Sequence, residues 1–268
     1  MMFSTNAVRC VLLLSLSLSG NAETIRGVQR ELERDLTSPG TATVDLQTAG
    51  NYAILAGTGI TTVPSSVITG DIAVYPAALA AMTGFSFTSD STGAALSTQI
   101  VGETQQVSHQ AYGKGGTVDD DLSDAVDDME LAYNDAAART ISPNNDDNYN
   151  FMDGLLDGQT LTPGVYDFTT GVSLNGDITF SGDGVFIIKM TGNLVQAGMT
   201  NVILADGAAA NKIFWQVAGT VSVGAGAHMK GIILGNTSVA FVTGSSLDGR
   251  VFAKTSCALQ QATITQSI

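Results

Sequence analysis

Hydrophobic and polar residues alternate with a period of two in short segments along the last third of the chain. Three of these segments are near copies spaced eighteen residues apart, and each has one apolar residue between small ones: Gly219–Ser222, Thr237–Ala240 and Thr255–Ala258. The alternation directs Val221, Val239 and Cys257 inward and their neighbours outward. A short unit that returns at a fixed spacing predicts a solenoid, in which each coil stacks on the next.

Looser copies extend the pattern upstream, at Thr58–Thr61, Thr170–Ser173 and Gly192–Val195. Their apolar residues add Ile60, Val172 and Leu194 to the predicted core. The other residues of the rungs are expected to share one flat outer face made of small, uncharged side chains. The candidate binding residues on this face are Thr58, Thr61, Thr170, Ser173, Asn193, Thr220, Ser222, Thr237, Ser238, Ala240, Thr255, Ser256 and Ala258.

The hydrophobic period changes in the middle of the chain, where apolar residues return every three or four positions. This spacing predicts one amphipathic helix over about 119–139, with its apolar stripe along the solenoid. The stripe consists of Leu122, Val126, Met129, Tyr133 and Ala136. Acidic residues at 119–121 favour the helix start, and Arg139 favours its end. The remaining acids of the helix are expected to face water: Asp124, Asp127, Asp128 and Asp135.

A calcium site is the alternative interpretation of this acidic run. The run lacks the glycine and the terminal glutamate of a calcium loop, so a solvated helix face is the better explanation. His109 and His228 lie in different predicted elements without a third ligand, which argues against zinc. The sequence therefore predicts neither a metal nor a cofactor.

The N-terminus has the features of a secretory signal peptide over residues 1–22. Arg9 precedes an apolar run at Cys10–Leu18, and small residues follow at Gly20–Ala22. Residues 23–45 are polar and are expected to form a mobile leader before a folded domain at 46–268. Removal of the signal peptide would leave Cys257 as a single buried thiol in a secreted, extracellular protein.

Composition and charge limit the partners. A chain of 268 residues with 44% hydrophobic residues, 13% charged residues and 30 glycines is typical of one globular domain rich in tight turns. The formal net charge of -14 disfavours binding to nucleic acid or anionic lipid. No segment has the roughly 20 apolar residues that a membrane span needs. Residues 64–98, with a short helical turn at 77–82, are expected to cap the solenoid and keep it monomeric.

Two blocks of motifs resemble the ice-binding protein family of cold-adapted bacteria, fungi and microalgae over roughly residues 46–268. The first block consists of Tyr52–Ala56, Thr58–Ile60, Ile68–Ile72, Pro76 and Thr83–Phe85. The second consists of Leu161–Tyr166, Ile213–Val217, Gly231–Leu234, Gly244 and Leu247–Val251. Their order and spacing follow the family, although none of them is specific alone.

The resemblance implies a mainly β fold: a discontinuous, right-handed parallel β-solenoid with one long helix along it. In such a fold the N-terminal coil, with Thr58–Thr61, closes on the C-terminal coils beside Thr255–Ala258. The resemblance also implies that the flat face binds ice, inhibits ice growth and recrystallisation, and produces thermal hysteresis. Highly active members often repeat a four-residue motif on this face. Its positions hold threonine, then alanine or glycine, then any residue, then threonine or asparagine. Only Thr58–Thr61 fits this pattern fully, so moderate activity is expected.

Two other functions compete with ice binding. A polysaccharide-binding solenoid would need exposed aromatic residues for stacking on sugars, and of Phe214 and Trp215 at most one can face outward. A polysaccharide-degrading enzyme would need clustered acids, whereas most acids after residue 160 adjoin glycine in turn-like settings. Asp248 and Arg250 are expected to form a surface ion pair. A protein that is not an enzyme and whose partner is an ice crystal surface is the favoured prediction.

Overall fold

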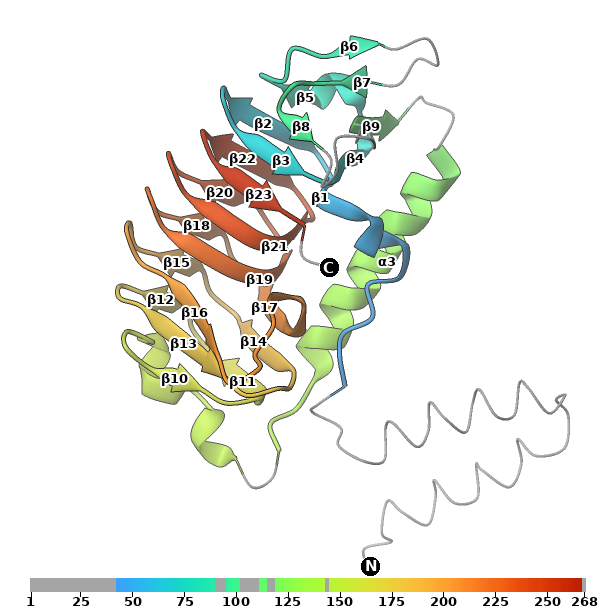
Figure 1. Cartoon of the computed structure of the whole chain (residues 1–268). Helices are drawn as coiled ribbons and strands as arrows, with labels where there is room; N and C mark the ends of the chain where they lie inside the picture. The colour runs from blue at the N-terminus through green and yellow to red at the C-terminus, as the bar shows by residue number, and fades with distance from the viewer. Residues whose placement is uncertain (1–41, 90–94, 102–110, 115–118, 143–144, 267–268) are drawn as a thin grey trace, which may run out of the picture.

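The protein is a stack of β-coils with three sides and one long helix along the first side (Figure 1). The computed structural model describes residues 42–89, 95–101, 111–114, 119–142 and 145–266. The predicted signal peptide, most of the predicted leader and His109 lie outside these residues. Each coil contributes short parallel strands to the sides, so side chains alternate between the interior and the surface of the stack.

The side under the helix is the widest, and we call it the helix side. In spatial order its strands are β11 (Gly164–Phe168), β14 (Phe186–Met190), β17 (Ile213–Val217), β19 (His228–Gly235), β21 (Ser246–Ala253), β1 (Tyr52–Ala56), β4 (Asp71–Ala78), β9 (Ala111–Lys114), β7 (Ala95–Leu96) and β6 (Thr88–Ser89). The pairs from β11 to β9 are parallel, and β9, β7 and β6 pair antiparallel at one end.

The second side is one parallel sheet of short strands, which we call the ladder face. Its strands in spatial order are β12 (Val172–Leu174), β15 (Leu194–Gln196), β18 (Val221–Val223), β20 (Val239–Phe241), β22 (Ser256–Gln260), β2 (Gly59–Val63) and β5 (Met82–Thr83). The near-identical rungs of the sequence are thus neighbours in space.

The third side begins with the sheet of β10 (Thr160–Leu161), β13 (Ile178–Ser181) and β16 (Val202–Ala205). It continues through the first halves of β19 and β21 to β23 (Thr263–Thr265), β3 (Val67–Thr69) and β8 (Ile100–Val101). Short 3-10 turns connect the sides: η1 (Gln47–Asn51), η2 (Leu79–Ala81), η3 (Asp146–Asn148), η4 (Phe151–Gly154) and η5 (Ala210–Lys212). The turn at η2 confirms the short helical turn predicted at 77–82.

The N-terminal coil closes on the C-terminal coils, as predicted. Strand β1 lies between β21 and β4, and β2 lies between β22 and β5. In register, Ile60 pairs with Cys257 and Thr61 pairs with Ala258. The ladder face therefore continues without interruption across a break of about two hundred residues in the sequence.

The predicted core ladder is confirmed. Its six apolar residues are at most 1% exposed and lie in register across the ladder face: Ile60, Val172, Leu194, Val221, Val239 and Cys257. Larger side chains fill the rest of the interior, where Phe180 packs edge to face on Phe186 and Trp215. Burial of this apolar surface is the main force that holds the coils together.

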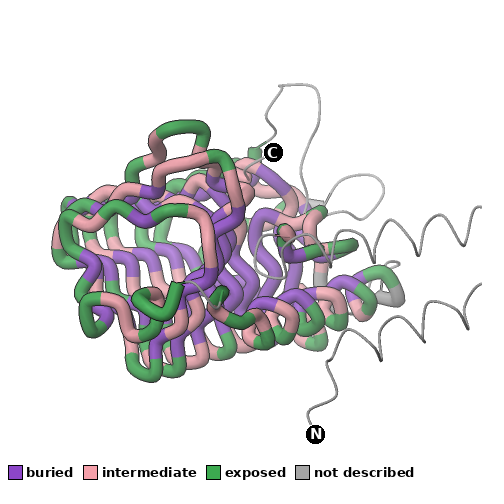
Figure 2. The backbone as a smooth tube through the Cα atoms, turned by 90° about the horizontal axis from the view of Figure 1, so that it is seen from below, coloured by how far each residue is buried: buried purple, intermediate pink, exposed green. Residues whose placement is uncertain are grey.

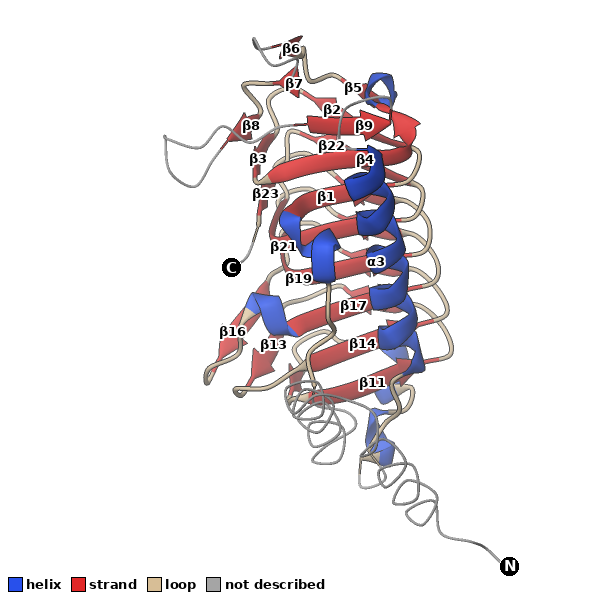
Figure 3. Ribbon diagram, turned by 90° about the vertical axis from the view of Figure 1, so that its right-hand side faces the viewer, coloured by secondary structure: helices blue, strands red, loops and turns tan. Residues whose placement is uncertain are grey.

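Helix α3 (Asp119–Ala138) lies across the strands of the helix side and forms a second core with them (Figure 3). Leu122, Met129 and Ala136 of the predicted stripe are buried, and Val126 and Tyr133 are half-buried against the same cluster. The helix ends one residue before the predicted Arg139. It thus covers outward apolar residues of the sheet such as Phe214.

Two acids predicted to face water also have protein partners at the surface. The Asp128 carboxylate accepts hydrogen bonds from the backbone N–H of Thr48, at 3.0 Å, and from its hydroxyl. Asp135 pairs with Arg139, with 2.7 Å between the charged atoms. The partner of Asp128 comes from the N-terminal segment, which follows no periodic pattern. Val44 in this segment is 2% exposed, so the packed domain begins before residue 46.

Candidate functional site

The ladder face presents a straight row of outward side chains, one from each rung. Backbone pairing places them in register from one end of the stack to the other, in the order Leu155, Ser173, Val195, Ser222, Ala240, Ala258, Thr61 and Thr83. Neighbouring parallel strands lie about 4.8 Å apart, so the seven steps of the row span roughly 34 Å. The alternation of buried and less buried residues along each coil is visible in Figure 2.

A second row lies two residues earlier on each rung, and its exposed or half-exposed members are Asn193, Thr220, Ser238 and Ser256. The remaining predicted residues start their rungs at the corner with the helix side: Thr58, Thr170, Thr237 and Thr255. At this corner the Thr58 N–H donates to the Thr255 carbonyl at 2.8 Å. The structure therefore brings all the predicted candidate residues together on one face and its edge.

The polar groups on this face divide into internal and free ones. The Thr237 hydroxyl donates to the Gly219 carbonyl, and the Asn193 side-chain oxygen accepts from the Thr220 N–H at 2.8 Å. By contrast, the hydroxyls of Thr61, Thr220 and Ser222 make no hydrogen bond to any part of the chain that the structure describes. These hydroxyls are available to surface water, whereas Asn193 and Thr237 chiefly hold their rungs in place.

The rows carry no charged or titratable side chain. The titratable group nearest to the middle row in sequence is Cys257, which points into the core, where burial raises the pKa of its thiol to about 12. The surface is therefore an uncharged array of methyl groups and hydroxyls at any pH near neutrality. The rows therefore contain no general base that could activate one of their hydroxyls as a nucleophile.

Three residues of the middle row were missed by the sequence analysis. Val195 ends the recognised rung Gly192–Val195 but was not among the candidate residues, although it is 41% exposed. Thr83 follows an inward Met82, and this short alternation could have revealed it. Leu155 stands outside every rung-like segment, and a backbone bridge to Ser173 places it in the row.

Comparison with known proteins shows to which family the chain belongs. The family described as Ice-binding-like matches residues 54–265. The chain belongs to the ice-binding protein family. It is 38% identical over 255 residues to the ice-binding protein of Leucosporidium sp. (strain AY30), covering 94% of this chain and 90% of that protein. It is 44% identical over 202 residues to ice-binding protein K1-A of Typhula ishikariensis, covering 74% and 79%.

Solved structures of ice-binding proteins share the fold. The glycosylated ice-binding protein LeIBP from an Arctic yeast superposes with a TM-score of 0.78 at 41% sequence identity, over 84% of this chain and 95% of that chain. The Shewanella frigidimarina ice-binding protein domain superposes with a TM-score of 0.74 at 25% identity, over 85% and 99%. The mainly β solenoid with one long helix is therefore common to this chain and these ice-binding proteins.

The aromatic residues of β17 are not available for stacking on sugars in this ice-binding family member. Trp215 points into the solenoid core and is fully buried, and its indole N–H donates to the Lys230 carbonyl at 2.9 Å. Phe214 points out of the sheet but is 1% exposed because α3 covers it. The observation that would favour a polysaccharide-binding surface is thus missing from this strand.

The acids of the solenoid do not cluster, and two of them form separate ion pairs with lysines on different sides. Lys189 pairs with Asp167 at 2.9 Å on the helix side, and Lys230 pairs with Asp248 at 3.5 Å on the third side. The predicted ion pair between Asp248 and Arg250 is wrong. The strand turns from the third side to the helix side between them, and the Arg250 Nε donates instead to the Gly50 carbonyl at 3.1 Å.

Among the described residues, His, Cys, Asp and Glu form no group of three or more that could hold a metal ion. No helix in the described part of the chain is both long and apolar enough to cross a membrane.

Proposed function

We propose that this protein adsorbs to ice crystals through the ladder face and thereby inhibits ice growth and recrystallisation. The observation that carries the proposal is the middle row, in which uncharged outward side chains lie in register along the whole stack. Membership of the ice-binding family supports the same function.

The chemistry of ice explains why such a row is suitable. An ice surface presents only water oxygens on a lattice, so binding requires many weak contacts from a rigid surface. The methyl groups of Ala240 and Ala258 order water around them, and the hydroxyl of Thr61 anchors that water by hydrogen bonds. Side chains that branch at Cβ, such as threonine, lose little rotamer entropy when this layer merges with ice.

The irregular composition of the row supports moderate rather than high activity. Only the rung Thr58–Thr61 both begins and ends with threonine, and apart from Thr61 and Thr83 the middle row holds serine, alanine, valine and leucine. A threonine contributes both a methyl group and a hydroxyl, whereas serine and alanine each lack one of them. The layer of water that this face orders is therefore less regular than a full threonine array would give.

We infer further that the protein is secreted, acts as a monomer and is not an enzyme. The apolar run near the N-terminus supports export. The strands β5 and β8 lie at the edges of their sheets and have only two residues each, so these edges offer little backbone for pairing with another copy. The rows of the ladder face carry hydroxyls but no general acid or base, which supports a role without catalysis.

A single ice crystal grown in a dilute solution of the protein tests the function. We expect faceted growth and a gap between the melting and freezing temperatures, with recrystallisation suppressed in a polycrystalline film. A crystal that keeps the round disc shape seen in buffer, at protein concentrations up to the millimolar range, would refute ice binding. The matched control is the same protein after thermal unfolding.

A further inference from the structure

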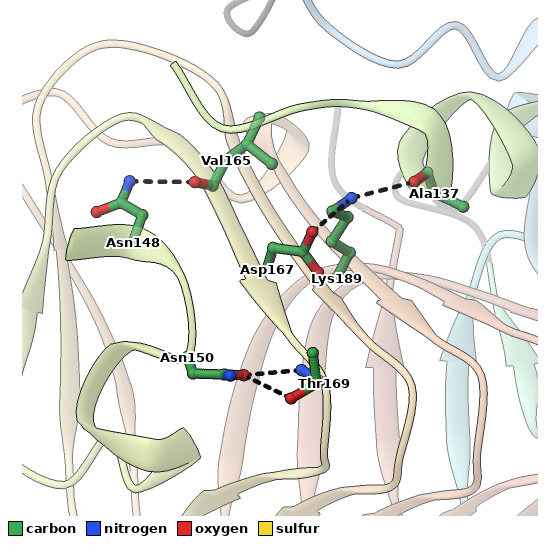
Figure 4. Close-up of polar contacts among 7 residues, drawn as sticks. All are labelled: Ala137, Asn148, Asn150, Val165, Asp167, Thr169 and Lys189. Carbon is green, nitrogen blue, oxygen red and sulfur yellow. Dashed lines mark hydrogen bonds and ion pairs between the residues drawn. The ribbon is translucent and has the colours of Figure 1, made fainter. Parts of the chain in front are cut away.

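Below β12 the chain makes a partial coil over residues 145–157, which we call the base coil. Asparagine side chains tie it to the first full coil (Figure 4). Asn148 donates from its side-chain amide to the Val165 carbonyl at 3.1 Å, and the Asn150 side-chain oxygen accepts from the Thr169 N–H at 2.8 Å. The base coil is thus hydrogen-bonded to the stack and continues the register of the coils above it.

A tight turn within the base coil directs its last residues onto the ladder face. Asn150, Met152 and Asp153 have φ angles of 48°, 49° and 51°, in the left-handed region that residues other than glycine seldom adopt. The turn is held by a hydrogen bond from the Asp153 N–H to the Asn150 carbonyl at 2.9 Å, and by one from the Leu155 N–H to the Met152 carbonyl at 2.9 Å. An unusual backbone is therefore maintained where the chain enters the ladder.

The result of this turn is an outward leucine next to an inward one. Leu156 is fully buried, and its N–H donates to the Ser173 carbonyl at 3.1 Å. Leu155 pairs with Ser173 in parallel register and is 53% exposed. Leu156, together with the edge-to-face pair of Phe151 and Tyr166, closes the core. The core therefore does not require an apolar residue at position 155.

Leu155 continues the middle row of the ladder face by one rung. Its neighbours in the row are Ser173 and then Val195, which is 41% exposed. This end of the row is thus the most apolar, with two branched side chains on either side of a serine. The remaining rungs carry Ser, Ala or Thr.

We propose that Leu155 and Val195 form an ice-contacting end of the ladder face, where branched aliphatic groups replace threonine. This inference rests on the proposed function. The proposed ligand at this end of the ladder face is ordered water continuous with ice. The Leu155 and Val195 side chains lie in line with the middle row and on the same uncharged surface. A protein partner would need about 800 Å² of surface, far more than two side chains supply.

Lysine substitution at these positions tests the proposal. In Leu155→Lys a hydrated ammonium group replaces the branched end of the side chain, and we expect thermal hysteresis at equal concentration to fall by roughly twofold or more. Leu155→Thr should keep most of the activity, because threonine restores a methyl group and a hydroxyl. Val195→Lys should act like Leu155→Lys.

Tyr149→Lys is the matched control. Tyr149 lies in the same base coil and is 54% exposed, but it pairs with Asp167 on the helix side and so faces away from the ladder. We expect its thermal hysteresis to equal that of the unmodified protein. The melting temperatures of all four variants are measured in parallel, so that a loss of folding is recognised separately.

Ala240→Tyr, in the middle of the row, separates this proposal from the proposed function. Loss of activity in Ala240→Tyr and Leu155→Lys, with Tyr149→Lys unchanged, is the expected result. Loss in Ala240→Tyr but not in Leu155→Lys would overturn the extended face and leave the proposed function standing. Full activity in Ala240→Tyr would overturn the face itself. Equal loss in Leu155→Lys and Tyr149→Lys would assign the effect to the stability of the base coil and overturn the contact.

Discussion

Replacing Gln99 by leucine should weaken the attachment of the capping segment around Gly84 to the N-terminal coil, which contains Thr62. Gln99 is 7% exposed, and its side-chain amide joins three separate segments. The side-chain oxygen accepts from the Thr62 hydroxyl at 3.0 Å and from the Ser66 N–H at 3.2 Å. The side-chain nitrogen donates to the Gly84 carbonyl at 2.9 Å. Leucine has nearly the same size but makes none of these bonds.

The size of the effect follows from how deeply the partners are buried. Thr62 is 8% exposed and Ser66 is 1% exposed, so water cannot readily replace the lost bonds. The Ser66 N–H loses its acceptor, and the Thr62 hydroxyl keeps only a long bond of 3.4 Å to the Val63 carbonyl, at a cost of about 1–3 kcal/mol for each unsatisfied group. Gly84 is exposed, so its carbonyl can bind water instead. After some compensation from the apolar side chain, we expect a loss of about 3 kcal/mol in the free energy of unfolding. For a domain of this size that lowers the melting temperature by roughly 10 °C.

Thermal unfolding followed by circular dichroism measures this change. Gln159→Leu is the control, because Gln159 is half-exposed and its side chain makes only a 3.4 Å hydrogen bond to the Asp157 carbonyl. Its melting temperature should stay within about 1 °C of the unmodified protein, as for most surface changes. If Gln99→Leu melted as close to the unmodified protein as this control, the amide would not be what holds the cap.

Three further predictions concern pH, metal and glycosylation. Burial raises the pKa of the Cys257 thiol to about 12, so the folded state keeps a proton that the unfolded chain releases above about pH 8.5. We expect the free energy of unfolding to fall as pH rises from about 9 to 12. Cys257→Ala should reduce this fall but not abolish it, because burial also raises the pKa of Tyr52 to about 12. The free energy of unfolding is measured by chemical denaturation at several pH values, and an equally steep fall with pH in Cys257→Ala would contradict the prediction. Dialysis against a chelator should leave crystal shaping and folding intact, and a loss that calcium restores would reveal an ion site. Asn236 is exposed at the corner before β20 and begins the glycosylation sequon Asn236–Ser238. Mass spectrometry of active native protein should find no sugar on Asn236, because a glycan there would hold the ladder face away from ice. A glycosylated Asn236 in fully active protein would mean that ice binds another face.

The ladder could be predicted from the sequence because its rungs repeat closely. Val221, Val239 and Cys257 recur at one spacing within matching small residues, and strict alternation then determines which side chains face out. The family motifs supplied the closure of the first coil, which joins Thr61 to Ala258. Local periodicity could not have revealed this pairing, because it joins residues from opposite ends of the chain.

The parts that escaped prediction depend on irregular backbone or on contacts between distant segments. The place of Leu155 is set by left-handed residues such as Met152, a conformation that no sequence signal at that position announces. Asp128 was expected to face water because its partner, Thr48, lies in a segment without periodicity. Arg250 was paired with Asp248 because the turn of the strand between two sides is not visible in the alternation of residues.

The most direct test of the central claim is the ice activity of Ala258→Tyr compared with Asp127→Tyr. Ala258 lies in the middle row between Ala240 and Thr61, so a tyrosine there would project from the plane without entering the core. Asp127 is exposed on α3, which packs on the helix side of the stack and not on the ladder face. We predict that thermal hysteresis falls strongly in Ala258→Tyr and is unchanged in Asp127→Tyr, with both melting temperatures near that of the unmodified protein. Undiminished hysteresis in Ala258→Tyr, or an equal fall in Asp127→Tyr, would contradict the assignment of the ladder face as the surface that meets ice.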